Sequence, residues 1–581
     1  MEPVGPIGES QGFVRLASSE YFATADLSHF VYESTIPLWA FDASESEAGG
    51  LYEYANLGNP HPLLVGVRGG PQSTDLISAC GTKLGSPHST QSGAVGEALS
   101  ADGRVVIFTA QKCSNGVPVL AQQLWARIDG ESPDARSVEL SAPAANCPAC
   151  ATSEPEGAVL QGASEDGFRA LFTSAQQLTS EAQQGSQNLY LYEDLKEQPL
   201  SGNHLVDISA SDTSGHGPDV QGVMAVSADG SHVYFVAGGV LAGANAEGAS
   251  PAEGGDNLYV YERDATFPAG HTNFIATLPG QGATANGEEA EAVEWTGRST
   301  VVASVTPDGR FLLFTSHGAL TSDTVPRTEA PAQVFRYDAD SQRLLRVSIG
   351  RAGFNNNGNA GGGEAQIALP ANNRISSGRR DPSMSDDGSR AFFESPVALT
   401  PGALDDVSVN GRDESAALAR NVYEWQAPGT GECGEASGCV ALISDGKDTT
   451  ETSGGDIRVT FSSVKLIGTD ASGENVFFST ADPLVPADTD TGYDIYDARS
   501  GGGFASLPTP IPCQADACKG AATRAGFGPS PGSPTFNGPE EGARHPVKSK
   551  HHRHKRKHRT KKTQEKRRKH RRAGHDHGGK Q

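Results

Sequence analysis

The chain has 581 residues, of which 70 are glycine and 7% are aromatic, and its formal net charge is −24. That charge is unevenly divided, because the residues from Arg544 onward include 17 Lys and Arg and 2 acidic residues, which leaves 29 basic and 68 acidic residues before them. An acidic body of net charge −39 should repel nucleic acids and anionic membranes, whereas the basic tail should attract them. No stretch approaches the roughly 18 apolar residues of a membrane-spanning helix.

A nonapeptide recurs along the chain and is best preserved in residues 308–316 (DGRFLLFTS). Its Asp-Gly pair favours a tight turn with positive φ, and the consecutive apolar residues that follow predict a short strand buried on both faces. Six copies are clear, and a weaker one lies near Asp26–Tyr32. We therefore expect seven central strands, at residues 30–34, 105–109, 169–173, 232–236, 311–315, 390–394 and 475–479.

A second signature follows each copy, an aliphatic residue alternating with an aromatic one, as in Leu258–Tyr261 (LYVY). This alternation is typical of a half-buried strand. Further short apolar segments precede the turn and follow the alternating strand, so that each unit holds four strands joined as a meander, which is the pattern of one propeller blade. The sequence therefore predicts an all-β protein, a seven-bladed β-propeller of four-stranded antiparallel blades over residues 11–508.

Eight blades are the alternative to seven. Residues 12–17 (GFVRLA) resemble the outermost strand of a blade. They either close the ring onto the last blade or are the remnant of an upstream blade. Residues 1–10 are expected to be a disordered N-terminus.

The repeat pattern stops after Leu507. Residues 509–543 are rich in Pro and Gly and predict a linker, and residues 544–581 predict a disordered His/Lys/Arg tail. The tail could bind an anionic polymer, such as one in a cell wall, by counterion release, or it could be a solvated segment with no dedicated partner. The basic residues assigned to this binding are Lys555, Arg556, Lys557, Lys561, Lys562, Arg567, Arg568 and Lys569.

The combination of residues 226–230 (VSADG) with residues 257–261 (NLYVY) resembles the WD-repeat-like, TolB-type propeller repeats of bacterial envelope proteins. The resemblance covers residues 20–508. The ending, Cys513 and Cys518 followed by the basic tail, is similar to that of secreted propeller proteins of high-GC actinobacteria. The resemblance implies a binding scaffold. Because the blades are longer than usual, the role of TolB in envelope import is not carried over.

The eight cysteines fall into local pairs. An even number with close partners in loop-like sequence indicates disulfides and an oxidising compartment, although reduced thiols, or zinc at Cys147 and Cys150, are alternatives. The expected disulfides are Cys80–Cys113, Cys147–Cys150, Cys433–Cys439 and Cys513–Cys518. We expect an extracellular or cell-envelope location. Because the first residues lack the basic and apolar regions of a signal peptide, that peptide would be absent from this chain.

Few residues suggest chemistry. Asp488, Asp490 and Asp494 alternate around a glycine and could bind Ca²⁺, or they form an Asx-rich turn without an ion. No other cofactor is expected. Gly528–Gly532 matches the nucleophile-elbow pattern by chance, because its flanking prolines do not allow the helix that the elbow needs. The adjacent acids Asp386 and Asp387 do not by themselves form an acid–base pair.

We therefore expect a non-catalytic, extracellular or envelope-associated binding scaffold, a monomer whose protein or glycan ligand the sequence does not identify. The alternative is a propeller enzyme, a lyase or hydrolase of polysaccharides with its site in the central channel. That alternative requires acids, histidines or tyrosines from several blades to converge at one mouth of the ring.

Overall fold

The computed structural model divides the chain into two compact units, residues 1–509 and 510–581. It describes residues 21–34, 37–39, 41–42, 49–55, 62–86, 96–114, 117–152, 156–193, 196, 204–279, 303–323, 331–350, 355, 363–368, 382–409, 418–450, 463–500 and 502. All of these lie in the first unit. The predicted linker, the basic tail and residues 12–17 lie outside the described residues.

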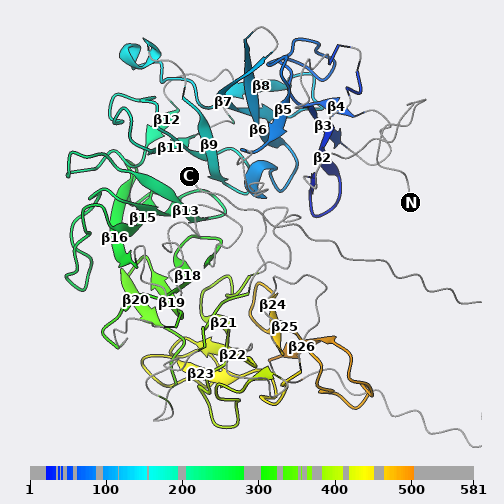
Figure 1. The fold of residues 1–581 in the computed structure, drawn as a ribbon, viewed down its shortest axis with the longest axis vertical. Helices are drawn as coiled ribbons and strands as arrows, with labels where there is room; N and C mark the ends of the chain where they lie inside the picture. The colour runs from blue at the N-terminus through cyan, green and yellow to red at the C-terminus, as the bar shows by residue number, and fades with distance from the viewer. Residues whose placement is uncertain are drawn as a thin grey trace, which may run out of the picture. The chain divides into compact units, whose positions relative to one another are not determined.

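Within the described part of the chain, the strands form seven antiparallel sheets, and the strands of each sheet pair in chain order (Figure 1). We call the sheets blades 1 to 7. Blade 1 contains β1 (Tyr21–Ala23), β2 (His29–Ser34), β3 (Gly50–Ala55) and β4 (Leu63–Leu64), and blade 2 contains β5 (Thr82–Leu84), β6 (Val105–Ser114), β7 (Val117–Ile128) and β8 (Arg136–Glu139). Blade 3 contains β9 (Ala158–Ala163), β10 (Ala170–Ser174), β11 (Asn188–Tyr192) and β12 (Leu205–Asp207).

The remaining blades repeat this order. Blade 4 contains β13 (Val220–Val226), β14 (His232–Ala237), β15 (Asp256–Glu262) and β16 (His271–Leu278), and blade 5 contains β17 (Ala303–Val305), β18 (Phe311–Ser316), β19 (Gln333–Asp338) and β20 (Arg343–Arg346). Blade 6 contains β21 (Arg390–Ser395), β22 (Asn421–Gln426) and β23 (Cys439–Leu442), and blade 7 contains β24 (Lys465–Thr469), β25 (Asn475–Thr480) and β26 (Asp494–Arg499). Two short 3-10 helices, η1 (Gly96–Ala98) and η2 (Pro148–Thr152), lie in loops.

This arrangement confirms the predicted seven-bladed β-propeller, and each predicted central strand lies in β2, β6, β10, β14, β18, β21 or β25. Blades 6 and 7 have three described strands instead of the expected four. Among the described residues of blade 6, two isolated bridges, Gln366–Glu394 and Met384–Ala391, join the inner edge of β21 in place of an innermost strand.

The turn before each central strand differs from the expected Asp-Gly hairpin. In blade 4, Gly230 N donates to Ser227 O at 2.9 Å, so the central residues of the turn are Ala228 and Asp229, and the glycine follows with φ of 70°. Two side chains hold this geometry. Ser227 Oγ donates to Asp229 Oδ1 at 2.8 Å, and His232 N donates to Ser227 Oγ at 2.9 Å. The serine two residues before the aspartate therefore sets the turn type.

Blade 7 makes the same turn with the two residue types exchanged. Asp470 stands where the other blades have Ser or Thr, and Ser472 stands where they have Asp. Ser472 Oγ donates to Asp470 Oδ1 at 2.9 Å, and Glu474 N donates to the same oxygen at 3.1 Å. The hydrogen bond across the turn is thus preserved although the donor and acceptor have changed places.

In blades 2 to 7 the glycine of the turn packs against the preceding blade, and blade 1 has Leu27 at this position, with φ of 59°. A Cβ on Gly309 would lie 2.4 Å from Cβ of His232, and one on Gly388 would lie 2.1 Å from Cδ2 of Phe311. Both glycines also have positive φ, 80° and 66°. Because no other residue type satisfies both conditions without strain, the glycine fixes the contact between blades as well as the turn.

The core lies between neighbouring blades. Leu171 and Leu189 of blade 3 pack in one cluster with Phe235 and Tyr259 of blade 4. One face of a sheet thus packs against the preceding blade, and the other face packs against the following blade. Aromatic pairs on adjacent strands recur, as in Phe235–Tyr259 and Phe314–Phe335, whose ring centroids both lie 5.7 Å apart. Burial of each such side chain contributes about 1.5–3 kcal/mol.

Blade 7 is the exception to this pattern. Phe477 is 37% exposed and Ile495 is 70% exposed, and both lie on one face of the β25–β26 pair. The residues at the position of Phe477 in the other six central strands are 0% exposed: Val31, Ile107, Leu171, Tyr234, Leu313 and Phe392. The prediction of strands buried on both faces is therefore wrong for blade 7, because no described sheet covers that face.

Candidate functional site

The inner strands of blades 1 to 6 surround a cavity of about 610 Å³. Its wall consists of the segments that lead into the turns, one from each of these blades. The lining residues come from 23–25, 97–101, 161–165, 223–228, 303–307 and 382–386. Because the repeat places one such segment at the same point of every blade, the cavity is a direct product of the repeat.

Backbone hydrogen bonds join these segments from blade to blade. The residue before each turn aspartate donates to its counterpart in the next blade: Ala101 N to Glu165 O at 2.8 Å, Glu165 N to Ala228 O at 2.7 Å and Ala228 N to Pro307 O at 2.9 Å. Pro307 has no N–H, so it cannot continue the series into blade 6. Asp386 N donates to Ala471 O at 2.8 Å and joins blade 6 to blade 7. We call these residues the inner belt.

The hydroxyl groups of the turn residues in the wall are already engaged. Ser100 Oγ donates to Asp102 Oδ1 at 2.7 Å, Ser164 Oγ to Asp166 Oδ1 at 2.7 Å and Thr306 Oγ1 to Asp308 Oδ1 at 2.6 Å. Each of these three oxygens also accepts a hydrogen bond from a backbone N–H at 3.0 Å. No histidine lies among the described lining residues to act as a base for them. They therefore serve the turn and are not activated nucleophiles.

Three carboxylates line the cavity: Glu97 in η1, and Glu165 and Asp386 in the inner belt. None of them has a side-chain hydrogen bond or ion pair with another described residue. The adjacent Asp387 behaves differently, because it accepts hydrogen bonds from Ser385 Oγ at 2.7 Å and from Ser389 N at 2.9 Å. The sequence pair Asp386-Asp387 thus divides into one residue of the cavity and one of the turn.

The wall contains no other charged side chain. No Lys, Arg, Cys or Tyr is found among the described lining residues, which are otherwise mainly Ala, Val, Ser and Thr. The enzyme alternative requires acids, histidines or tyrosines from several blades to converge. Among the described lining residues, only carboxylates do so. Sequence reasoning missed Glu97 and Glu165 and did not assign Asp386 to a site.

Asp488, Asp490 and Asp494 lie together between β25 and the start of β26, and each offers a carboxylate oxygen within 4.8 Å of the other two. Asp490 Oδ1 accepts from Gly492 N at 2.8 Å, and Asp488 accepts from the Tyr496 hydroxyl. Three hard oxygen ligands suit Ca²⁺, while the hydrogen bonds within the loop agree equally with an Asx-rich turn. The group is thus brought together, and calcium binding stays a prediction.

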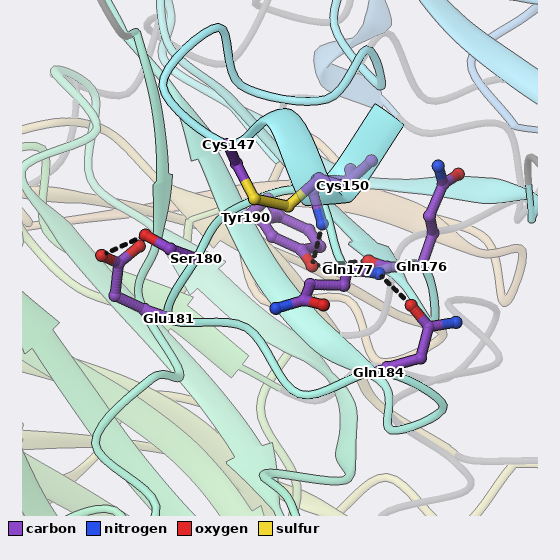
Figure 2. The surroundings of a disulfide bond; sticks show 9 residues. Cys147, Cys150, Gln176, Gln177, Ser180, Glu181, Gln184 and Tyr190 are labelled. Carbon is purple, nitrogen blue, oxygen red and sulfur yellow. Dashed lines mark hydrogen bonds between the residues drawn. A yellow bond between two sulfur atoms is a disulfide. The ribbon is translucent and has the colours of Figure 1, made fainter. Parts of the chain in front are cut away.

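Three of the expected disulfides are present: Cys80–Cys113, Cys147–Cys150 and Cys433–Cys439. Cys147 directly precedes η2 and Cys150 lies within it, and their pairing replaces the zinc alternative. Figure 2 shows the surroundings of this disulfide, where Tyr190 donates its hydroxyl proton to Gln176 O at 2.6 Å. Ala144 N donates to Leu178 O at 2.8 Å and attaches the disulfide loop to blade 3. Cys513, Cys518 and the basic tail residues lie outside the described residues.

One buried carboxylate outside the cavity is electrostatically unusual. Asp207 at the end of β12 is 8% exposed, and its Oδ2 has no hydrogen-bond partner among the described residues. Its Oδ1 accepts from Ser209 N at 2.9 Å and from Ser209 Oγ at 2.6 Å. Burial raises the pKa of Asp207 to about 6 despite these two bonds. The side chain lies in β12, the outer strand of blade 3, and does not line the cavity.

Solved structures similar to this chain are β-propellers of several kinds. TolB from Acinetobacter baumannii is 13% identical, over 56% of this chain and 53% of TolB, with a TM-score of 0.24. The β-propeller domain of the Trilobed protease from Pyrococcus furiosus is 10% identical, over 82% of this chain and 91% of that domain, with a TM-score of 0.27. The β-propeller domain of Cps50 (Swd1) from Myceliophteria thermophila is 11% identical, over 69% of this chain and 83% of that domain, with a TM-score of 0.26.

The chain spans about half the length of TolB, and a match to prolyl oligopeptidase B from Galerina marginata covers 46% of that enzyme. No protein-family model and no curated protein matches the sequence. The class of protein that the seven sheets define is a β-propeller. Neither of the two 3-10 helices in the described residues has the length and apolarity needed to cross a bilayer.

Proposed function

We propose that this chain is a non-catalytic binding scaffold whose ligand enters the cavity between the inner strands. The observation that carries the proposal is the composition of that cavity. Its volume of about 610 Å³ is that of a ligand site, and its wall combines small apolar residues with a few polar groups. The hydroxyl groups of its turn residues are bonded within the turns and are not activated for reaction, so the wall offers surface and charge for binding.

The second candidate is a polysaccharide lyase or hydrolase, and the carboxylates of the cavity are the specific observation in its favour. Glycoside hydrolysis uses two carboxyl groups about 5–9.5 Å apart, with the acid kept protonated by its surroundings. Glu165 and Asp386 are both exposed to solvent. Because burial is what keeps a carboxyl group protonated at neutral pH, neither residue has the surroundings that the catalytic acid needs. A lyase needs a base beside a group that neutralises the sugar carboxylate, and the described wall has no cation for that task.

The location that we propose is extracellular or in the cell envelope. Three disulfides in the described residues support it, because such bonds form and persist in oxidising compartments. The basic tail, with 17 Lys and Arg, would attach the scaffold to an anionic polymer of the cell surface. Retention on immobilised teichoic acid that falls steeply as salt is raised from 50 to 200 mM, by roughly the thousandfold that six or more charge contacts give, would support this attachment.

The scaffold proposal is tested by measuring binding and turnover together. Purified full-length protein is incubated with a panel of glycans and peptides. Calorimetry reports binding, and the release of reducing ends or unsaturated sugars reports catalysis. We expect at least one ligand to bind without turnover. Ala25→Trp and Ala101→Trp, which fill the mouth of the cavity at exposed positions, should abolish binding, while Ala436→Trp on an exposed loop should not. Turnover that the two cavity variants abolish would establish the enzyme instead.

A further inference from the structure

The cavity between the inner strands carries charge of one sign. Glu97, Glu165 and Asp386 line it, and no described lining residue is Lys or Arg. Carboxylates elsewhere in the described chain are often compensated. Arg104 Nε lies 2.7 Å from Asp129 Oδ1, and Arg310 Nε lies 3.0 Å from Asp338 Oδ1. The three cavity carboxylates have no such partner among the described residues, so the described wall contributes net negative charge to the cavity.

The spacing of these carboxylates distinguishes between kinds of cation. Among the described residues, the one group of three or more potential ligands whose atoms lie within 4.8 Å of one another is Asp488, Asp490 and Asp494. Glu97, Glu165 and Asp386 therefore lie too far apart to chelate a single metal ion together. They come from blades 2, 3 and 6, so a ligand that meets all three must carry several positive charges spread along its length.

The surface between the carboxylates is partly apolar. Val226, Val305 and Pro307 line the cavity, are at least partly exposed and lie among several alanines. A flexible alkyl chain can lie on such a surface while its charged ends stay hydrated or paired. The hydroxyl groups of the turn residues are engaged in the turns, so these groups offer few hydrogen bonds to a sugar.

We propose that the cavity binds an extended, polyvalent organic cation, in which alkyl segments rest on the apolar wall and ammonium groups pair with Glu97, Glu165 and Asp386. This inference rests on the proposed scaffold function and names its ligand class. Two sources carry the same chemistry, a free polyamine and the lysine side chains of a peptide. The exposed carboxylates attract the ligand and orient it, and exclusion of water by the alkyl segments adds to the affinity.

The test uses the full chain and two probes, spermine and a pentalysine peptide, with binding measured by calorimetry at 50 mM and 200 mM salt. The variant Glu97→Gln/Glu165→Gln/Asp386→Asn removes the three cavity charges and keeps the side-chain shapes. The matched control, Glu247→Gln/Glu432→Gln/Glu435→Gln, removes three charges at exposed loop positions outside the cavity. Circular dichroism melting of both variants verifies that they fold as the wild type does.

We expect the cavity variant to lose about tenfold or more in affinity, because it loses three ion pairs at exposed or half-buried carboxylates, and the control to stay within about twofold. Preferential binding of spermine identifies a free polyamine as the source, and preferential binding of pentalysine identifies a peptide. Equal weakening of both variants would mean that the field of the whole acidic body holds the probe, and it would overturn the proposal. So would failure of both probes to bind the wild type, whereas turnover of a glycan would refute the scaffold function separately.

Discussion

Replacement of Asp207 by Asn should stabilise the protein at neutral pH and have no effect in acid. Burial raises the pKa of Asp207 from 3.8 to about 6. Between these pH values the folded protein keeps a proton on Asp207 that the unfolded chain has released. The contribution of this protonated side chain to the free energy of unfolding is therefore fully present below pH 3.8 and is lost as the pH rises through about 6. The loss above pH 6 amounts to about 3 kcal/mol, since one pKa unit is worth about 1.36 kcal/mol. Asparagine resembles the protonated form and does not incur this loss.

The assay is thermal unfolding of the full chain by calorimetry at pH 4 and pH 7.5. Asp207→Asn should raise Tm by a few degrees at pH 7.5 and leave it unchanged at pH 4. Asp212→Asn is the control of opposite sign. Hydrogen bonds from Ser214 and from two glycine N–H groups outweigh desolvation and lower the pKa of Asp212, so this variant should lower Tm at pH 7.5. An equal change for Asp207→Asn at both pH values, or a lower Tm at pH 7.5, would refute the reasoning.

Three further changes test the repeat and the candidate calcium site. Gly309→Ala should cost about 2–3 kcal/mol, since its Cβ would collide with His232, whereas Gly402→Ala, with φ of 91° and no heavy atom within 4 Å, should cost about 1 kcal/mol; equal losses of Tm would contradict the packing argument. Asp470→Ser should cost about 1–2 kcal/mol, and Asp470→Ser/Ser472→Asp should recover most of it, as a double-mutant cycle would reveal; no recovery would mean that residue identity matters more than the hydrogen bond. Calcium at 10 mM should stabilise the wild type by about 1 kcal/mol and leave Asp488→Asn/Asp490→Asn unchanged, with magnesium as the control; equal shifts in both proteins would exclude this site.

The architecture could be predicted because the same pattern of turn and strand recurs in every unit of the sequence. The central strands followed from the apolar run after each Asp-Gly, and the disulfides among the described residues from local spacing. The turn type could not be predicted from the Asp-Gly pair, because Ser227 changes it through a side-chain hydrogen bond. The exposure of Phe477 could not be predicted either, because burial depends on a neighbouring sheet and not on the strand that carries the residue.

The carboxylates of the cavity were partly within reach of the sequence. The residue before each turn aspartate lies in the inner belt, and it is Ala or Pro in blades 1, 2, 4, 5 and 7. Alignment of the copies would have marked Glu165 and Asp386 as departures from this rule. Glu97 has no such signal, because it lies in η1 outside the repeated motif and reaches the cavity through the tertiary fold.

Pro307 has a mechanical consequence for the inner belt. Blades 2 to 5 are joined there by successive backbone bonds, and blade 6 is joined to blade 7, but the proline cannot donate toward blade 6. The boundary between blades 5 and 6 depends instead on side chains, such as Arg336 Nε donating to Gly388 O at 2.9 Å farther along the turn. Separation of the two blades at this point breaks no belt hydrogen bond, so side-chain packing holds this seam: Phe311 of blade 5 lies in one apolar cluster with Phe393 and Trp425 of blade 6.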